Sequence, residues 1–140
     1  SSFAAVAGRA DTGISQCRAG QLAAGSANIS AALAALRQDM AGRGAMEDAV
    51  EAALADCFIQ MRRFDDAESL LRGVDREKVA QLIGDQNFSA LVDLALAEIA
   101  LGRGNRNRAR TLFDAANGPL KTTQDLFVKN RVVALQRSLH

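Results

Sequence analysis

LADCFIQMRRFDDAESLLRGV, residues 54–74, carries the clearest pattern in the chain, and LAEIALGRGNRNRARTLFDAA, residues 96–116, repeats it 42 residues later. In both stretches apolar residues recur at helical spacing on either side of a polar turn. A short turn between two helices forces them to run antiparallel. Each stretch therefore predicts a pair of antiparallel helices.

The two stretches match at four kinds of position: a leucine, the small residue beside it, an alanine that opens the second helix, and a bulky residue four positions on. The matched pairs are Leu54 and Leu96, Ala55 and Ala97, Ala67 and Ala109, and Leu71 and Phe113. This pattern resembles the tetratricopeptide repeat (TPR) family, whose repeat is about 34 residues long. The resemblance implies stacked helix pairs that share one core, with the extra residues of the longer period in a short helix around 76–83.

Helical periodicity extends over most of the chain, and composition agrees with it: 28 residues are Ala, one is Pro, and Trp and Tyr are absent. The predicted fold class is all-α, an antiparallel helix-pair stack or TPR-like α-solenoid of about seven helices. We expect a flexible N-terminal edge over 1–10 and a single helical repeat domain over 11–140 that ends in a capping helix. Breaks are expected at Gly25-Ser26, at a turn over 42–44, and at Asn117-Gly118-Pro119.

Charge is divided unevenly, since residues 1–102 carry a net −5 and residues 103–140 a net +6. The densest basic patch is formed by Arg103, Arg106, Arg108 and Arg110. Nucleic acid is an unlikely partner, because no aromatic platform accompanies these arginines, so nucleic-acid binding ranks third among the functions considered. A solvated turn or an anchor for an acidic partner fits the patch better.

No group of residues predicts catalysis, a metal site or a cofactor. His140 is the only histidine and ends the sequence, while Cys17 and Cys57 are too isolated for a metal site. Cys57 is expected to be a small buried apolar residue. With no apolar run of about 18 residues, no membrane span is expected, and a cytoplasmic location follows from treating the cysteines as reduced.

The resemblance implies that the first helix of each pair lines a concave groove, in which the family holds a peptide. The expected partner-binding residues are Asp56, Ile59, Gln60, Leu91, Leu94, Glu98 and Leu101. Their face is apolar with two carboxylates, so an apolar peptide with one or two basic residues would suit it. We expect a protein–protein interaction module, a TPR-like scaffold or regulatory domain of bacterial type. The alternative is a small-molecule-binding sensor domain of a transcriptional regulator.

The last helix is expected over 123–139, as a cap packed on the helix that holds Phe113. Its apolar stripe faces inward, and Lys129, Arg131 and Arg137 lie on the opposite, solvent side. A second apolar edge is left over, and it either wraps around the preceding pair or forms a homodimer contact.

Overall fold

The computed structural model describes residues 2–39 and 44–140, and all regular secondary structure in this part of the chain is α-helix. The all-α prediction is confirmed, with eight helices in the described ranges. They are α1 (Phe3–Arg18), α2 (Leu22–Asp39), α3 (Gly44–Gln60), α4 (Phe64–Arg72), α5 (Arg76–Ile83), α6 (Phe88–Gly102), α7 (Arg106–Leu120) and α8 (Leu126–Leu139).

Three helix pairs, α1/α2, α3/α4 and α6/α7, repeat with a period of 42 residues. The first helices end at Arg18, Gln60 and Gly102, and the second helices begin at Leu22, Phe64 and Arg106. Each connection places one residue in the left-handed region at the same point of the repeat: Gly20 (φ 84°), Arg62 (φ 58°) and Gly104 (φ 82°). The part of the chain that the structure describes therefore contains three copies of the unit, one more than the clear sequence pattern shows.

The first copy is hard to find in the sequence because glycines stand where the other two copies have alanines. Gly25, which was expected to break a helix, lies inside α2. It occupies the position that Ala67 and Ala109 hold in the second helices of the later pairs. A Cβ on Gly25 would lie 2.7 Å from the carbonyl oxygen of Gly13 and 2.4 Å from Cys17 Sγ. The prediction of a break here is wrong because this glycine allows two helices to cross closely, and the break falls at Gly20.

Other helix boundaries also differ from the predicted ones. The expected flexible edge is helical from Phe3, because the side chain of Ser2 caps α1. The stop predicted at Asn117-Gly118-Pro119 lies within the last turn of α7, which ends one residue after Pro119, at Leu120. The predicted turn over 42–44 lies mostly outside the described residues.

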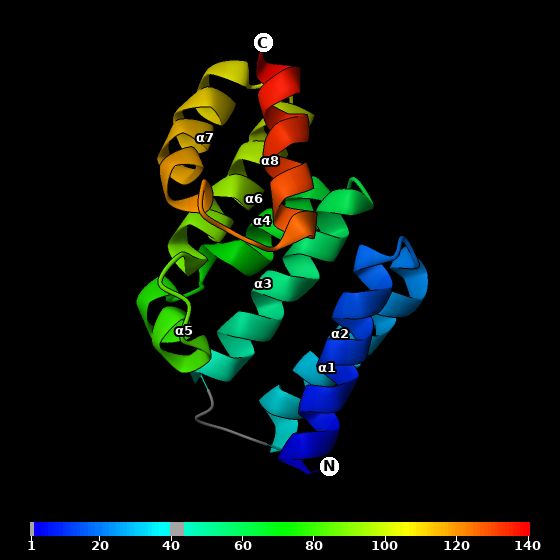
Figure 1. The fold of residues 1–140 in the computed structure, drawn as a ribbon. Helices are drawn as coiled ribbons and strands as arrows, with labels where there is room; N and C mark the ends of the chain where they lie inside the picture. Colours follow the sequence, from blue (N-terminus) through cyan, green and yellow to red (C-terminus); the bar gives the residue numbers. More distant parts are fainter. Residues whose placement is uncertain (1, 40–43) are drawn as a thin grey trace.

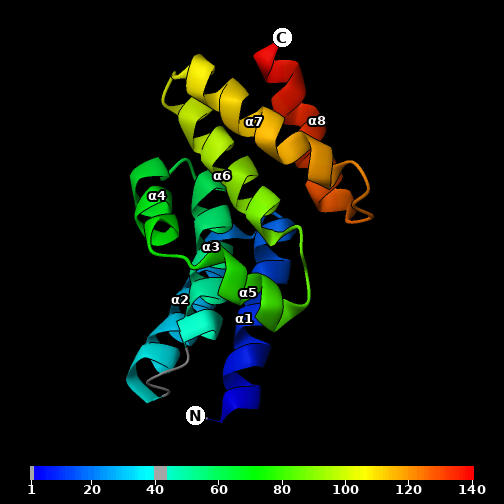
Figure 2. The ribbon, with the colours of Figure 1, turned by 90° about the vertical axis from the view of Figure 1, so that its left-hand side faces the viewer.

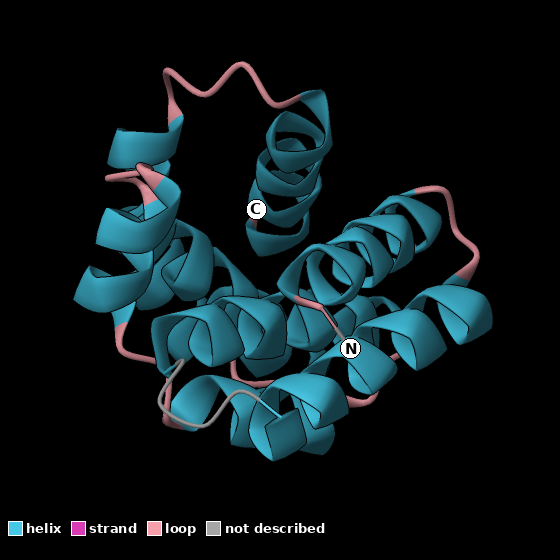
Figure 3. Cartoon of the chain, turned by 90° about the horizontal axis from the view of Figure 1, so that it is seen from below, coloured by secondary structure: helices cyan, strands magenta, loops and turns pink. Residues whose placement is uncertain are grey.

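The three pairs stack in chain order, with α1/α2 at one end, α3/α4 in the middle and α6/α7 at the other end (Figures 1 and 2). The short helix α5, which the sequence predicts around 76–83, links the second pair to the third, and its cap, Asp75, accepts from the backbone N–H of Lys78 at 3.2 Å. Seen from below, the pairs form an arc and α8 lies on its inner side (Figure 3). The position of α8 determines which part of the concave face is left open.

Candidate functional site: a concave face divided by the last helix

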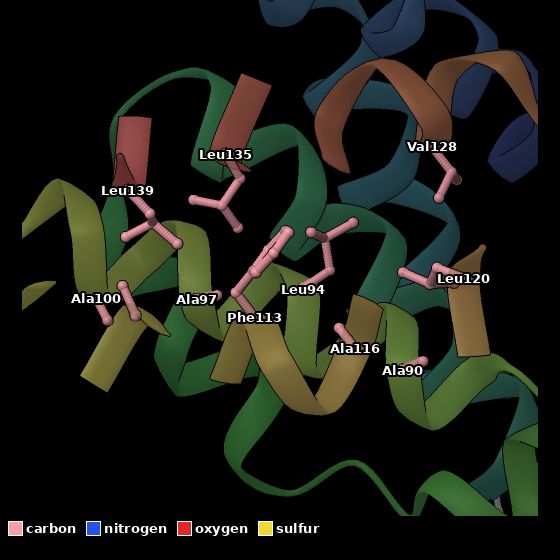
Figure 4. Close-up of a cluster of buried hydrophobic side chains, with 11 residues drawn as sticks. Ala90, Leu94, Ala97, Ala100, Phe113, Ala116, Leu120, Val128, Leu135 and Leu139 are labelled. Atoms are coloured by element: carbon pink, nitrogen blue, oxygen red, sulfur yellow. The ribbon is translucent and has the colours of Figure 1, made fainter. Parts of the chain in front are cut away.

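Helix α8 packs into the concave face rather than over the end of the stack. Val128, Leu135 and Leu139 are buried in one cluster with Leu94 of α6 and Phe113 of α7 (Figure 4). The predicted contact with the helix that holds Phe113 is present. The apolar stripe of α8 also reaches α6, which belongs to the groove-lining set of helices.

An arginine on α8 joins it to two of these groove-lining helices. Arg131 Nη2 donates to Asp56 Oδ1 of α3 at 3.2 Å, and Arg131 Nε donates to Glu98 Oε1 of α6 at 3.2 Å. The expected placement of Arg131 on the solvent side is wrong, because its side chain is only 13% exposed. The sequence pattern misleads here because the guanidinium of Arg131 points into the concave face, where the carboxylates of Asp56 and Glu98 accept its hydrogen bonds.

Burial and charge act in opposite directions on this triad. Burial alone would lower the pKa of Arg131, but the carboxylates of Asp56 and Glu98 raise it above its ordinary value. Burial raises the pKa of Glu98, and the guanidinium of Arg131 offsets only part of that effect. The triad holds α8 by charge-assisted hydrogen bonds, and loss of Arg131 would leave the largely buried carboxylate of Glu98 without a partner.

The two ends of α8 are held by arginines from other helices. At its N-terminus, Arg18 of α1 pairs with Asp125 at 3.0 Å. Burial raises the pKa of Asp125, but the N–H of Val128 and the Arg18 guanidinium outweigh it, so this pKa lies below its ordinary value. At the C-terminus, Arg106 and Arg110 of α7 donate to backbone carbonyls of the last turn, each at 2.9 Å.

The basic patch predicted from the sequence is therefore partly used inside the molecule. Arg103 pairs with Asp65 and Glu68 of α4, in addition to the two arginines that hold the end of α8. Arg108 is exposed, and the side chain of Asn105 caps α7 by accepting from the backbone N–H of Arg108. Three of the four charges thus serve internal contacts.

The seven predicted partner-binding residues surround α8. On one side of it, Asp56, Gln60 and Leu91 line an open hollow, and on the other side a second cleft is lined by Ile59, Glu98 and Leu101. Leu94 is fully buried beneath α8 and does not face either cleft. Six of the seven residues therefore line two hollows, and the chain's own last helix lies between these hollows.

The hollow on the α1 side, called here the open groove, remains accessible. Its floor is α3, its walls are α1 and the segment from α5 into α6, and Phe127 of α8 lies at its upper end. The upper part, next to Phe127, has a volume of about 180 Å³, and the lower part, next to Phe3, has a volume of about 300 Å³. The two parts share Ile14, Ala49, Ile83 and Phe88, so they form one continuous depression.

Two of the exposed large hydrophobic side chains lie in the lining of this groove. In the described part of the chain there are five: Phe3, Leu82, Ile83, Leu126 and Val133. Of these, Phe3 and Ile83 line the groove. Exposed apolar side chains in the lining of a depression are typical of interaction sites.

A disulfide ties the wall of the open groove to its floor. Cys17 of α1 and Cys57 of α3 are bonded, with their Cα atoms 5.6 Å apart, and both line the groove. The expectation of two isolated thiols is wrong, although the prediction that Cys57 is buried is confirmed. The pairing was missed because it requires α1 and α3 to be neighbours, and the glycines conceal that copy of the repeat.

Comparison with family models, with curated proteins and with solved structures finds no match to this chain. The membrane test is likewise negative: within the described ranges, no helix combines the length and the apolar character needed to cross a bilayer.

Proposed function

We propose that this protein is a protein–protein interaction module that binds a segment of another protein in the open groove. The observation that carries this proposal is a continuous, mostly apolar depression that two exposed large hydrophobic side chains, Phe3 and Ile83, help to line. Their exposure costs free energy in the unbound protein, which a partner's apolar residues would recover. The helix-pair repeat, with small residues where helices cross, supports the TPR-like character of this module.

Binding rather than catalysis suits the charged groups of the groove. Asp56 is engaged by Arg131, and Arg18 is engaged by Asp125. A catalytic acid or base needs a proton to exchange and a fixed geometry toward a substrate. Groups held in ion pairs between helices instead fix the shape of the groove, so we propose that the protein is not an enzyme.

The disulfide bears on the compartment in which the module works. Structural disulfides persist in oxidising compartments and are rare in the cytoplasm. We therefore propose an oxidising compartment in place of the cytoplasmic location expected from the sequence. Alkylation of free thiols during denaturation of freshly lysed cells checks this. A protein from the cytoplasm would then have two alkylatable cysteines, whereas a disulfide-bonded protein would have none.

Site-specific photocrosslinking in the cells that produce the protein tests the binding function. A benzophenone amino acid at the exposed Gln60, on the rim of the groove, should capture a distinct partner, whereas the same group at the exposed Ala115 of α7 should not. Adding Ala53→Arg, which fills the floor of the groove, should abolish the crosslink. Crosslinks that are identical at both positions, or that survive the filled groove, would contradict the proposal.

A further inference from the structure

The site that α8 fills and the open groove are equivalent places in successive repeats. Around α8, Leu94 and Glu98 belong to α6, whereas Asp56 and Ile59 belong to α3. Subtracting the 42-residue period from these four gives Ala52, Asp56, Ile14 and Cys17. All four of the resulting residues line the open groove.

This equivalence shows what kind of segment the concave face holds. One copy of the site is occupied by an amphipathic helix, α8. The arginine of this helix reaches Glu98 of α6, which is the later of the two first helices that line this copy. In the other copy the same position carries Asp56, whose side chain is 39% exposed. Arg131 uses Asp56 Oδ1, and the carboxylate can accept further hydrogen bonds through its other lone pairs.

We propose that the open groove binds an amphipathic helix of another protein that carries an arginine on its apolar face. The arginine pairs with Asp56 in the way that Arg131 pairs with Glu98, and apolar residues three before and four after it enter the groove, as Val128 and Leu135 do in α8. This inference rests on the proposed function and names the chemistry of the partner.

A helix suits this groove better than an extended segment. The lining is helical and mostly apolar, and helix backbones have already used their hydrogen-bonding groups. An extended peptide would bury backbone N–H and C=O groups with few partners, which costs free energy for each group. A helix satisfies its backbone internally and presents only side chains to the groove.

The charge at the upper end of the groove also selects the partner. Arg18 is neutralised by Asp125, whereas Asp56 shares its single guanidinium with the buried Glu98. A partner's cation would therefore meet a carboxylate that is only partly compensated. The α8 of a second copy does not fit this role, because its Arg131 is already engaged within its own chain.

A synthetic peptide provides the probe, because α8 itself has the required pattern. The peptide LFVKNRVVALQRSL, residues 126–139, is labelled with fluorescein and titrated with the intact protein by anisotropy. Binding should be abolished by Ala53→Arg in the protein, and Ala115→Arg on α7 is the matched control that should bind normally. Replacing the peptide's sixth residue, its first arginine, by norleucine should weaken binding about 10-fold, because a charge-assisted hydrogen bond is lost.

A gain of affinity provides the sharper test. Ile14 is the repeat equivalent of Asp56, so Ile14→Asp gives the open groove the two carboxylates that surround Arg131. This variant should bind the arginine peptide about 10-fold more tightly and the norleucine peptide no more tightly. Ile14→Asn, which has the same shape without the charge, should show no gain, and circular dichroism verifies that both variants are folded.

The outcomes separate this inference from the proposed function. Equal affinity for the arginine and norleucine peptides, both abolished by Ala53→Arg, would overturn the arginine requirement and leave the groove as a binding site. Absence of peptide binding, or binding unaffected by Ala53→Arg, would overturn the inference. The photocrosslinking result would then still decide whether the groove binds a partner of different chemistry.

Discussion

Reduction of the Cys17–Cys57 disulfide should lower the free energy of unfolding by about 4 kcal/mol. The bond joins two residues that are 40 positions apart. Closing a loop of this length in the unfolded chain removes about 13 cal/mol/K of entropy, which is about 4 kcal/mol at 25 °C. A domain of this size has about 5–15 kcal/mol of stability in total, so the loss is large enough to measure with certainty.

The assay is urea unfolding followed by circular dichroism at 222 nm, with and without a phosphine reductant. With a denaturant dependence of about 2 kcal/mol/M, the midpoint should fall by about 2 M on reduction. The double variant Cys17→Ala/Cys57→Ala is the control, because it lacks the bond and its midpoint should not respond to the reductant. It should unfold near the midpoint of the reduced protein.

Two results would refute this reasoning. A midpoint that is unchanged by reductant, in a protein whose thiols are then shown to be free, would mean that the bond contributes no stability. Titration of two thiols in the denatured protein without any reductant would mean that the bond is absent. In the second case the wall and floor of the open groove would be held by packing alone.

Three further predictions concern α1 and α8. Arg131→Ala should destabilise the protein by about 3–5 kcal/mol in urea unfolding, because the largely buried carboxylate of Glu98 loses its partner, and Arg131→Met together with neutral amides at both carboxylates should recover much of the loss. Gly13→Ala should cost about 1–3 kcal/mol, since its Cβ would lie 2.8 Å from a carbonyl oxygen of α2, whereas Gly8→Ala in the same helix meets nothing within 4 Å and should gain about 0.5–1 kcal/mol. An equal effect of both glycine substitutions would contradict the close crossing. Because the pKa of Asp125 is lowered in the folded state, its contribution to stability is present above its ordinary pKa of about 3.9 and is lost as the pH falls through the lowered value. Asp125→Asn should therefore flatten the acid limb of a plot of thermal midpoint against pH, and an unchanged limb would disprove this assignment.

The all-α class and the second and third helix pairs could be predicted from local sequence. Helix formation in 54–74 and 96–116 depends on apolar spacing and on short polar turns, which act over a few residues. The left-handed position at Arg62 and Gly104 belongs to the same local pattern. The concave groove was implied by the resemblance to the TPR family rather than by local spacing, and six of the seven residues named for it line the two hollows beside α8.

The remaining features depend on which helices become neighbours, and local pattern does not contain that information. Gly25 is a typical helix breaker in isolation, and only the nearby backbone of Gly13 explains why it lies within a helix. The disulfide requires α1 to lie against α3, and the burial of Arg131 requires α8 to turn back into the concave face.

By itself, the sequence determined the all-α class and the helices of the second and third pairs, because these follow from apolar spacing and polar turns that act over a few residues. The tertiary structure alone decided where α8 lies and which half of the concave face stays open. The physical reason is that a buried guanidinium is stable only where two carboxylates from different helices converge on it, and that convergence exists only after the pairs have stacked.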